Sequence, residues 1–392
     1  MPRRNTPQSY GSVARTLHWL TALLILTAIP LGLFANDMAL TGAESAARKA
    51  QLFSLHKTLG VAAFAVALLR ILWAFVQPRP APLHPDRRVE TLAAEAVHWM
   101  LYLSLVAVPL SGWVHHAATT GFAPILWPLG QGLPFVPVSE TVAAAAGALH
   151  WVFTKLLIAS LLLHVAGALK HALIDRDGTL SRMVTGRAAG QAAPHPKAPA
   201  LAALAIYGAA AALAIGLTAP PEAAASAPQA AAGGNWQVQE GSLAFRVRQM
   251  GAEVEGRFAG WTAEIAFDEM PVEGKNGSVT VQIDLASLAL GSVSDQAKGP
   301  EFLDVSKHPT ATFTADIRPE GEGYVAEGML DLHGQSKPLA LPFSLTMSGD
   351  TARMTGSVAL DRRDFGIGAG YADEETVGFA VTLQIALTAV RK

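Results

Sequence analysis

The sequence predicts a multidomain membrane protein in two parts, an all-α set of transmembrane helices followed by an all-β antiparallel domain. Composition is the first reason, because 51% of the 392 residues are hydrophobic, only 15% are charged and the mean hydropathy is +0.31. The second reason is a series of five apolar stretches, each long enough to cross a bilayer. The third is a change near residue 235 to segments in which apolar and polar residues alternate.

The five predicted spans lie at about residues 17–34, 53–75, 93–114, 146–174 and 200–217. The first shows no small-residue cleavage site near its end, so we expect no cleavable signal peptide. Basic residues gather in three alternate segments: Arg3, Arg4 and Arg15, then Arg79, Arg87 and Arg88, then Arg176, Arg182, Arg187 and Lys197. The positive-inside rule therefore predicts a cytoplasmic N-terminus and, after five spans, a C-terminal domain outside.

The two parts also differ in charge. Residues 1–200 hold 16 Lys and Arg against 8 Asp and Glu, whereas the remainder holds 13 against 23. This asymmetry indicates two modules in different surroundings. The chain has no cysteine, which excludes disulfides, thiolate metal sites and covalent c-type haem attachment. Any haem would be held non-covalently by His or Met.

An Ala/Pro/Gly-rich linker at 218–234 separates the spans from the all-β domain. Alternating segments at 279–285, 311–317, 339–347 and 379–387, separated by turn signals, predict strands of a closed antiparallel barrel or a sandwich. A short helix is expected near 295–303.

Three histidines share one face of the fourth span. His150 and His164 are fourteen residues apart, which puts them within about 40° of each other and ~21 Å apart along a helix. His171 follows seven residues later, within about 20° of the same line. Imidazoles inside a membrane are costly and usually functional. This layout predicts two haems stacked across the membrane.

Matching the depths of histidines on different spans gives two ligand pairs. His56 would pair with His150 near the outer face, and His18 with His164 near the cytoplasmic face. Iron with two His ligands has no open position for oxygen and suits electron transfer. For any single histidine, a hydrogen-bonded interfacial role is the alternative.

Other residues near these positions leave alternatives open. On geometry alone His171 could replace His164, although the charged segment beside it favours an interfacial role, for example at a quinone pocket. Arg70 and Lys155 are intramembrane cations that either pair with haem propionates or extend to the headgroups.

Several motifs in the first part point to a known family. They are RTLHWL, LHKTLG, ALLRILW, VHWMLYLSLVAVPLSGW, a run H-x13-H-x6-H and DRDGTLSRM. Residues 10–185 thus resemble the bacterial cytochrome b561 family. The resemblance implies a four-helix bundle in the bacterial inner membrane with two b-type haems, which exchanges electrons with quinone. It matches His18, His56, His150 and His164 to the family's ligands, and leaves the span at 200–217 as an extra transmembrane helix.

The second part has its own resemblance, carried by SLAFRVRQMGAEVEGRF, FLDVSKHPTATFTA, GMLDLHGQSKPLALPF and LDRRDFGIG. Residues 235–390 resemble the YceI family. This implies a lipocalin-like barrel whose cavity takes a polyisoprenoid chain, including the tail of a quinone such as ubiquinone. Alternation alone fits a filled core equally well.

Other polar residues of the barrel are expected to have structural roles. His308 and His333 could form a metal pair, but a loop or rim role is favoured. The charged run 361–364 is expected to be a solvated strand end. No nucleophile–base arrangement is evident, so no catalytic residue is assigned.

We therefore expect three segments: a di-haem membrane domain at 1–185, a loop, helix and linker at 186–234, and a periplasmic barrel at 235–392. The expected function is electron transfer between the quinone pool and an unknown periplasmic redox partner, with an isoprenoid or quinone in the barrel and no nucleic-acid partner. One alternative is an isoprenoid-binding stress module merely anchored by the bundle. Another is superoxide:quinone oxidoreductase activity, which some b561 proteins have.

Overall fold

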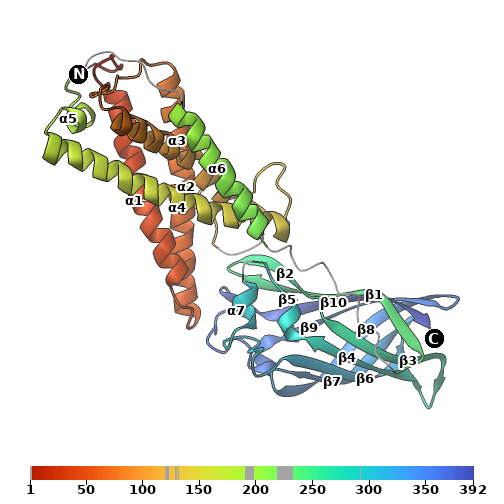
Figure 1. Ribbon diagram of the computed structural model, residues 1–392. Coiled ribbons are helices and arrows are strands. Elements are labelled where there is room, and N and C mark those ends of the chain that lie inside the picture. The colour runs from red at the N-terminus through yellow and green to blue at the C-terminus, as the bar shows by residue number, and fades with distance from the viewer. Residues whose placement is uncertain are drawn as a thin grey trace. The chain divides into compact units, whose positions relative to one another are not determined.

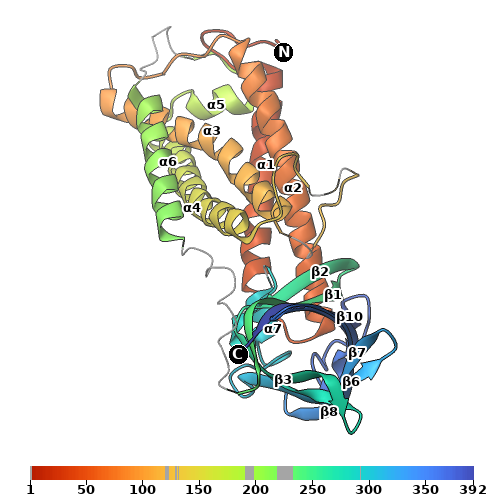
Figure 2. The same cartoon turned by 90° about the vertical axis from the view of Figure 1, so that its right-hand side faces the viewer.

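The computed structural model describes residues 2–119, 123–128, 130, 132–189, 198–218, 233–291 and 293–392 (Figures 1 and 2). The chain divides into two compact units, one helical and one built on a β-sheet. Most of the predicted linker 218–234 lies outside the described residues, as does Lys197.

Within the described part of the chain, five helices are long and apolar enough to cross a membrane. They are α1 (Ser12–Asp37), α2 (Ala43–Phe75), α3 (Arg88–Ala117), α4 (Glu140–Lys170) and α6 (Ala198–Leu217). The chain is thus a multi-pass membrane protein, as the sequence predicted. The helices extend past most of the expected span ends, because hydropathy marks the part of a helix that lies in lipid and not where its hydrogen bonding stops.

The four predicted bundle helices share one hydrophobic cluster. Each contributes one buried residue, namely Ile25 from α1, Ala67 from α2, Leu105 from α3 and Leu157 from α4. Large apolar side chains on the other faces are exposed, as in Leu72 (63%). Such exposure fits helices whose outer faces meet lipid.

The additional helix α6 packs against α3 and α4. Its Tyr207 is buried, hydrogen-bonds the hydroxyl of Ser104 and donates to the carbonyl of Met100 at 3.3 Å. The Tyr207 ring also stacks on Phe153, with 5.2 Å between the centroids. The fifth span is therefore part of the bundle's packing and more than a tether.

The end of α4 departs from regular helix. A π-turn, η1 (His171–Asp175), continues it, and Arg176 then adopts a left-handed conformation with φ 51° before the short helix α5 (Thr179–Val184). This interruption changes the direction in which side chains after Lys170 point, which a regular 3.6-residue projection did not anticipate.

The β unit is an antiparallel sheet that closes on itself. Its strands are β1 (Trp236–Gln249), β2 (Ala252–Phe258), β3 (Trp261–Val272), β4 (Lys275–Asp284), β5 (Leu288–Ala289), β6 (Thr310–Glu320), β7 (Gly323–Leu332), β8 (Gln335–Ser348), β9 (Thr351–Asp361) and β10 (Val377–Arg391). The order is β10-β9-β8-β7-β6-β4-β3-β1-β2-β5, and β10 also pairs with β1. Closure through β1 and β10 makes the domain a barrel and not a sandwich.

The alternation seen in the sequence sets the inside and outside of this barrel. In β6, Ala311, Phe313, Ala315 and Ile317 are buried and alternate with residues that are more exposed. All four expected strands are confirmed. The expected helix near 295–303 is shorter, α7 (Ser294–Lys298), because Gly299 and Pro300 follow it.

Arg362, in the 3₁₀ turn η3 (Arg362–Phe365), corrects one expectation. It is 4% exposed, and its guanidinium donates to the carbonyls of Ile367, Gly368, Tyr371, Val377 and Gly378. The adjacent Arg363 is exposed and pairs with Asp361. A solvated strand end therefore describes Arg363 but is wrong for Arg362, which fixes the GIGAGYA segment against β10. The sequence of the charged run 361–364 does not show which of the two arginines is buried and which is exposed.

We predict that Arg362→Lys destabilises this part of the barrel by at least about 3 kcal/mol, because a lysine leaves several buried carbonyls unpaired. Hydrogen exchange in the full-length protein should show β9 and β10 amides exchanging at least about 100-fold faster. The matched change Arg363→Lys should leave the exchange unchanged. Equal protection in the two variants would contradict the structural role of Arg362.

Candidate functional site

Two pairs of imidazole rings face each other between helices of the bundle. The ring centroids of His18 on α1 and His164 on α4 are 6.1 Å apart, with an interplanar angle of 62°. Those of His56 on α2 and His150 on α4 are 6.3 Å apart, at 83°. The structure thus brings together the same two pairs that depth matching suggested.

The rings of His56 and His150 are held by the same backbone device. The Nδ1 atom of His56 hydrogen-bonds the Ala28 carbonyl at 2.8 Å, and a Cβ on Gly32 would lie 2.7 Å from the His56 ring. We call a carbonyl with a glycine four residues later on the neighbouring helix a glycine–carbonyl cradle. Since a carbonyl can only accept, Nδ1 carries the proton and Nε2 keeps its lone pair.

His150 sits in an equivalent cradle on α3. Its Nδ1 hydrogen-bonds the Val108 carbonyl at 2.8 Å, and a Cβ on Gly112 would lie 2.9 Å from the ring. Both members of this pair therefore present an Nε2 lone pair. Locking the tautomer through the other ring nitrogen is how proteins prepare a histidine for metal binding.

A third cradle holds His115 of α3. Its Nδ1 bonds the Ala143 carbonyl at 2.7 Å, and Gly147 stands against the ring. The His115 ring lies 4.9 Å from His116. The cradle therefore orients a histidine but does not by itself identify a ligand.

The spacing within each pair fits one metal ion between two imidazoles. With metal–nitrogen bonds of about 2.0 Å on opposite sides of the ion, two ring centres would stand about 6 Å apart. In addition, Nδ1 of His18 is buried and has no hydrogen-bond partner in the described part of the chain. A buried ring nitrogen without a partner is what a missing ion or group would explain. The residues present thus fit haem iron.

Other polar residues flank these pairs. Near His18 and His164 lie His98, whose ring is 5.2 Å from that of His164, and the half-buried Arg70, whose guanidinium is 5.4 Å from the Tyr102 ring. Lys155 is exposed, with its ammonium 5.4 Å from the ring of Trp151. An exposed lysine in this place fits the alternative in which its side chain extends toward the lipid headgroups.

Reasoning from the sequence missed Lys57. It follows His56 directly and is only 6% exposed. Lys57, His56 and His150 all lie within electrostatic range of His116, so this cation belongs to the surroundings of the His56–His150 pair. The sequence did contain a signal for this residue, because a lysine directly after a candidate ligand lies inside a predicted span.

His171 does not face His18. Its ring is stacked on that of His84, with centroids 6.1 Å apart and an interplanar angle of 4°. Its Nδ1 is 2.7 Å from Oδ2 of Asp177, and its Nε2 is 3.3 Å from Oε1 of Glu90. His84 Nε2 lies 3.0 Å from the same Asp177 oxygen. Desolvation works to raise the pKa of Asp177, but hydrogen bonds from Thr179, His84 and His171 leave it below its usual value.

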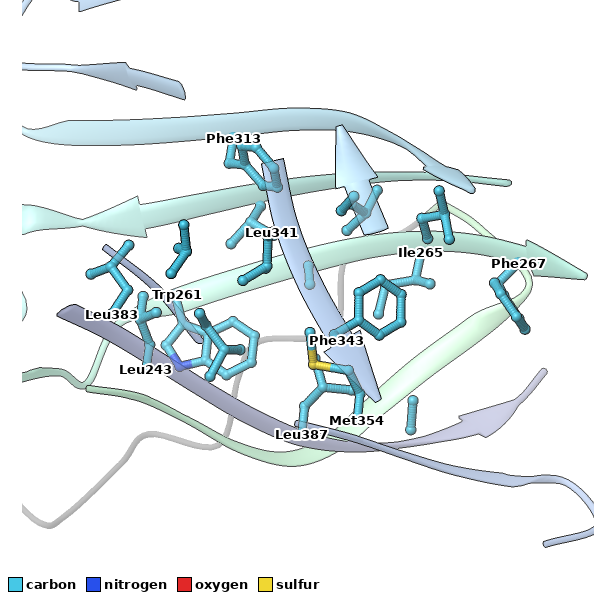
Figure 3. Close-up of a pocket in the computed structure, with 18 of the residues that line it drawn as sticks. Leu243, Trp261, Ile265, Phe267, Phe313, Leu341, Phe343, Met354, Leu383 and Leu387 are labelled. Carbon is cyan, nitrogen blue, oxygen red and sulfur yellow. The ribbon is translucent and has the colours of Figure 1, made fainter. Parts of the chain in front are cut away.

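The barrel encloses a cavity of about 140 Å³ (Figure 3). Its lining residues are all aliphatic, aromatic or Met. Trp261, Phe313, Phe343 and Met354, from four different strands, are among those drawn there. An engineered cavity of roughly 150 Å³ in another protein stays dry and binds benzene. The site is therefore suited to apolar chains or rings.

His308 and His333 come together, with ring centroids 4.9 Å apart. Nδ1 of His333 bonds the Phe365 carbonyl at 2.9 Å. This contact joins the turn after β7 to η3, as the favoured loop role suggested.

A membrane helix bundle with facing imidazole pairs, followed by an apolar-lined closed barrel, defines a membrane cytochrome that carries a lipocalin-like domain. Residues 9–186 match the family model of prokaryotic cytochrome b561, and residues 236–389 match that of the YceI-like domain. The chain is 34% identical over 187 residues to cytochrome b561 homolog 2 of Escherichia coli (strain K12), which covers 46% of this chain and 93% of that protein. The chain therefore belongs to the prokaryotic cytochrome b561 family and carries a YceI-like domain, so both resemblances are confirmed.

The barrel has similar proteins of its own. It is 31% identical over 137 residues to a UPF0312 protein of Pseudomonas aeruginosa, which covers 33% of this chain and 72% of that protein. Among solved structures it is similar to Burkholderia cenocepacia BcnA, with 29% identity and a TM-score of 0.36, over 38% of this chain and 96% of that one. Membership of the cytochrome family implies b-type haem.

We predict that Gly112→Ala disturbs a haem that His150 would hold, because the added Cβ would force the ring to move. The low-spin electron paramagnetic resonance signal of one haem should shift, or the haem content should fall. Gly60→Ala and Gly167→Ala are matched controls, since a Cβ at either position meets nothing within 4 Å. Those variants should keep the wild-type signals. A wild-type spectrum for Gly112→Ala would show that the cradle does not orient the ligand.

Proposed function

We propose that the chain is a membrane electron-transfer protein with two b-type haems, one held by His18 and His164 and the other by His56 and His150. The observation that carries this is the two imidazole pairs, with ring centroids 6.1 and 6.3 Å apart, in which Nδ1 of His56 and of His150 is hydrogen-bonded to a carbonyl and leaves Nε2 as the metal-binding atom. Two non-covalent haems agree with the absence of cysteine.

Each residue of the site has a definable task in this proposal. A b-type haem supplies a reversible one-electron couple. The four histidines would hold the haem irons, two to each iron, and iron with two His ligands has no open position for a small substrate. The cradle carbonyls and glycines fix the ring orientation of His56 and His150. Arg70 near one pair and Lys57 near the other can offset the negative charge of propionates.

We propose that the bundle exchanges these electrons with the membrane quinone pool and with a periplasmic redox partner. Family membership supports the quinone. The bundle's position in the bacterial inner membrane, with the N-terminus in the cytoplasm, is supported by the basic residues. Arg182 donates to the carbonyls of Gln8 and Ala81, so three basic segments meet at one end of the bundle. One side of the membrane would thus receive them all.

The proposed ligand of the barrel is a polyisoprenoid, including the tail of ubiquinone or another quinone. The cavity supports this choice because its walls offer an isoprenoid chain only apolar contacts. Because bundle and barrel are one chain, their encounter is intramolecular, and a short flexible tether gives effective concentrations of about millimolar.

Haem counting tests the ligand assignment. We expect about two haems per wild-type chain in a pyridine haemochrome assay, and about one in His56→Ala or His164→Ala. His115→Ala is the matched control, since His115 occupies the same kind of cradle without facing a partner across the bundle. It should keep both haems, as should His171→Ala. A wild-type count in the two ligand variants would refute the assignment.

Lipid extraction tests the barrel. We expect isoprenoid lipid to co-purify with the full-length protein and to be detected by mass spectrometry of the extract. Ala326→Phe fills the cavity and should reduce the lipid per chain, whereas Ala340→Phe, on an exposed position of β8, should not. The same lipid content in both variants would place the ligand elsewhere.

A further inference from the structure

Beyond electron transfer, one cluster of metal-ligating side chains lies apart from the haem pairs. His84 precedes α3, His171 begins the π-turn at the end of α4, and Asp177 follows that turn. Their ligand atoms all lie within 4.8 Å of one another. We propose that His84, His171 and Asp177 bind a divalent transition-metal ion of the zinc class.

The donor atoms converge on one point. Oδ2 of Asp177 lies 2.7 Å from Nδ1 of His171 and 3.0 Å from Nε2 of His84. Around a tetrahedral ion with bonds of about 2.0 Å, ligand atoms stand about 3.3 Å apart. Both observed distances are hydrogen bonds and are shorter than this, so the three groups would move apart slightly to admit the ion. His84 is 32% exposed and lies outside the helices, so its ring can move by the small amount needed.

The residues behind the ligands are those that a metal site requires. Metal-bound histidines usually donate their other ring N–H to a carboxylate. Oε1 of Glu90 lies 3.3 Å from Nε2 of His171 and could accept its proton, so Nδ1, which here hydrogen-bonds Asp177, could bind the metal once it has given up its own proton. The Thr179 backbone N–H donates to Oδ1 of Asp177 at 2.8 Å and turns Oδ2 toward the imidazoles.

The set His84, His171 and Asp177 differs in charge from a second set of possible ligands beside it. A second possible set, Glu90, His171 and Asp175, is already neutralised, because Lys170 contacts both carboxylates and Arg87 contacts Asp175. In the described part of the chain, Asp177 makes no ion pair with lysine or arginine. Its carboxylate contacts the Thr179 backbone N–H and the two imidazoles, so a cation would add the charge that this set lacks.

The backbone around the site is built to bring these ligands together. The π-turn and the left-handed Arg176 allow the N–H of Asp177 to bond the carbonyl of His171 at 3.2 Å. Two imidazoles with one carboxylate select zinc-class ions over magnesium or calcium, which prefer oxygen ligands. The bound ion would clamp the segment before α3 to the end of α4. This gives His171 a role other than the quinone contact considered from the sequence.

The test uses untagged, haem-loaded, full-length protein in detergent, stripped with a chelator and then equilibrated with Zn²⁺. Elemental analysis after gel filtration should find about one zinc per chain, and excess Mg²⁺ should not displace it. His84→Gln and Asp177→Asn should lose this zinc, whereas Glu90→Gln should weaken binding about 10–100-fold. The haem content of each variant serves as the control for folding.

His308→Gln, in the other histidine pair of the described chain, is the matched control and should keep the zinc. No zinc on the wild type, or undiminished zinc on His84→Gln and Asp177→Asn, would overturn the proposal. Loss of zinc only in His308→Gln would also overturn it, by moving the site to the barrel. X-ray absorption of the wild type provides a check without variants, because a shell of oxygen ligands alone would contradict the assignment.

Discussion

The hydrogen bond from an imidazole Nδ1 to a helix carbonyl is the interaction on which the helical unit depends. It requires a neighbouring helix to approach closely, and Gly32 and Gly112 provide the space. The same contact fixes which nitrogen faces the bundle interior. Helix packing and the tautomer of the imidazole are therefore set by one contact, and a side chain in place of either glycine would disturb both.

The β unit depends on a different constraint, the pairing of its first and last strands. Once β1 meets β10, alternate residues are forced inward, and apolar ones gather there. Arg362 ties the GIGAGYA segment to the start of β10 by donating to three carbonyls of the segment and two of the strand. The position of β10 thus determines both the wall of the cavity and the placement of the GIGAGYA segment.

Spacing and composition predicted the elements well, because apolar length and two-residue alternation report directly on lipid and barrel surroundings. The pairing of His18 with His164 was accessible from depth alone. The glycine–carbonyl cradles could not be predicted, because the sequence does not show which residue packs against a glycine inside an apolar span. Lys57 was missed and Arg362 was predicted wrongly for a related reason: from the sequence a charged residue is expected to be solvated, whereas tertiary packing can bury it. The π-turn after Lys170 was invisible because side-chain projections assume a regular helix.

Closure of the barrel also affects the order in which the molecule matures. Trp236 pairs with Arg391, so the first strand of the barrel cannot complete its pairing until the last strand, β10, has been synthesised. Such a non-local contact forms late and slowly, because the intervening loop must be closed first. The membrane helices are synthesised long before that moment. During biogenesis the bundle can thus assemble while the barrel strands still have unpaired edges, and truncation at the C-terminus would leave the barrel open without touching the histidine pairs.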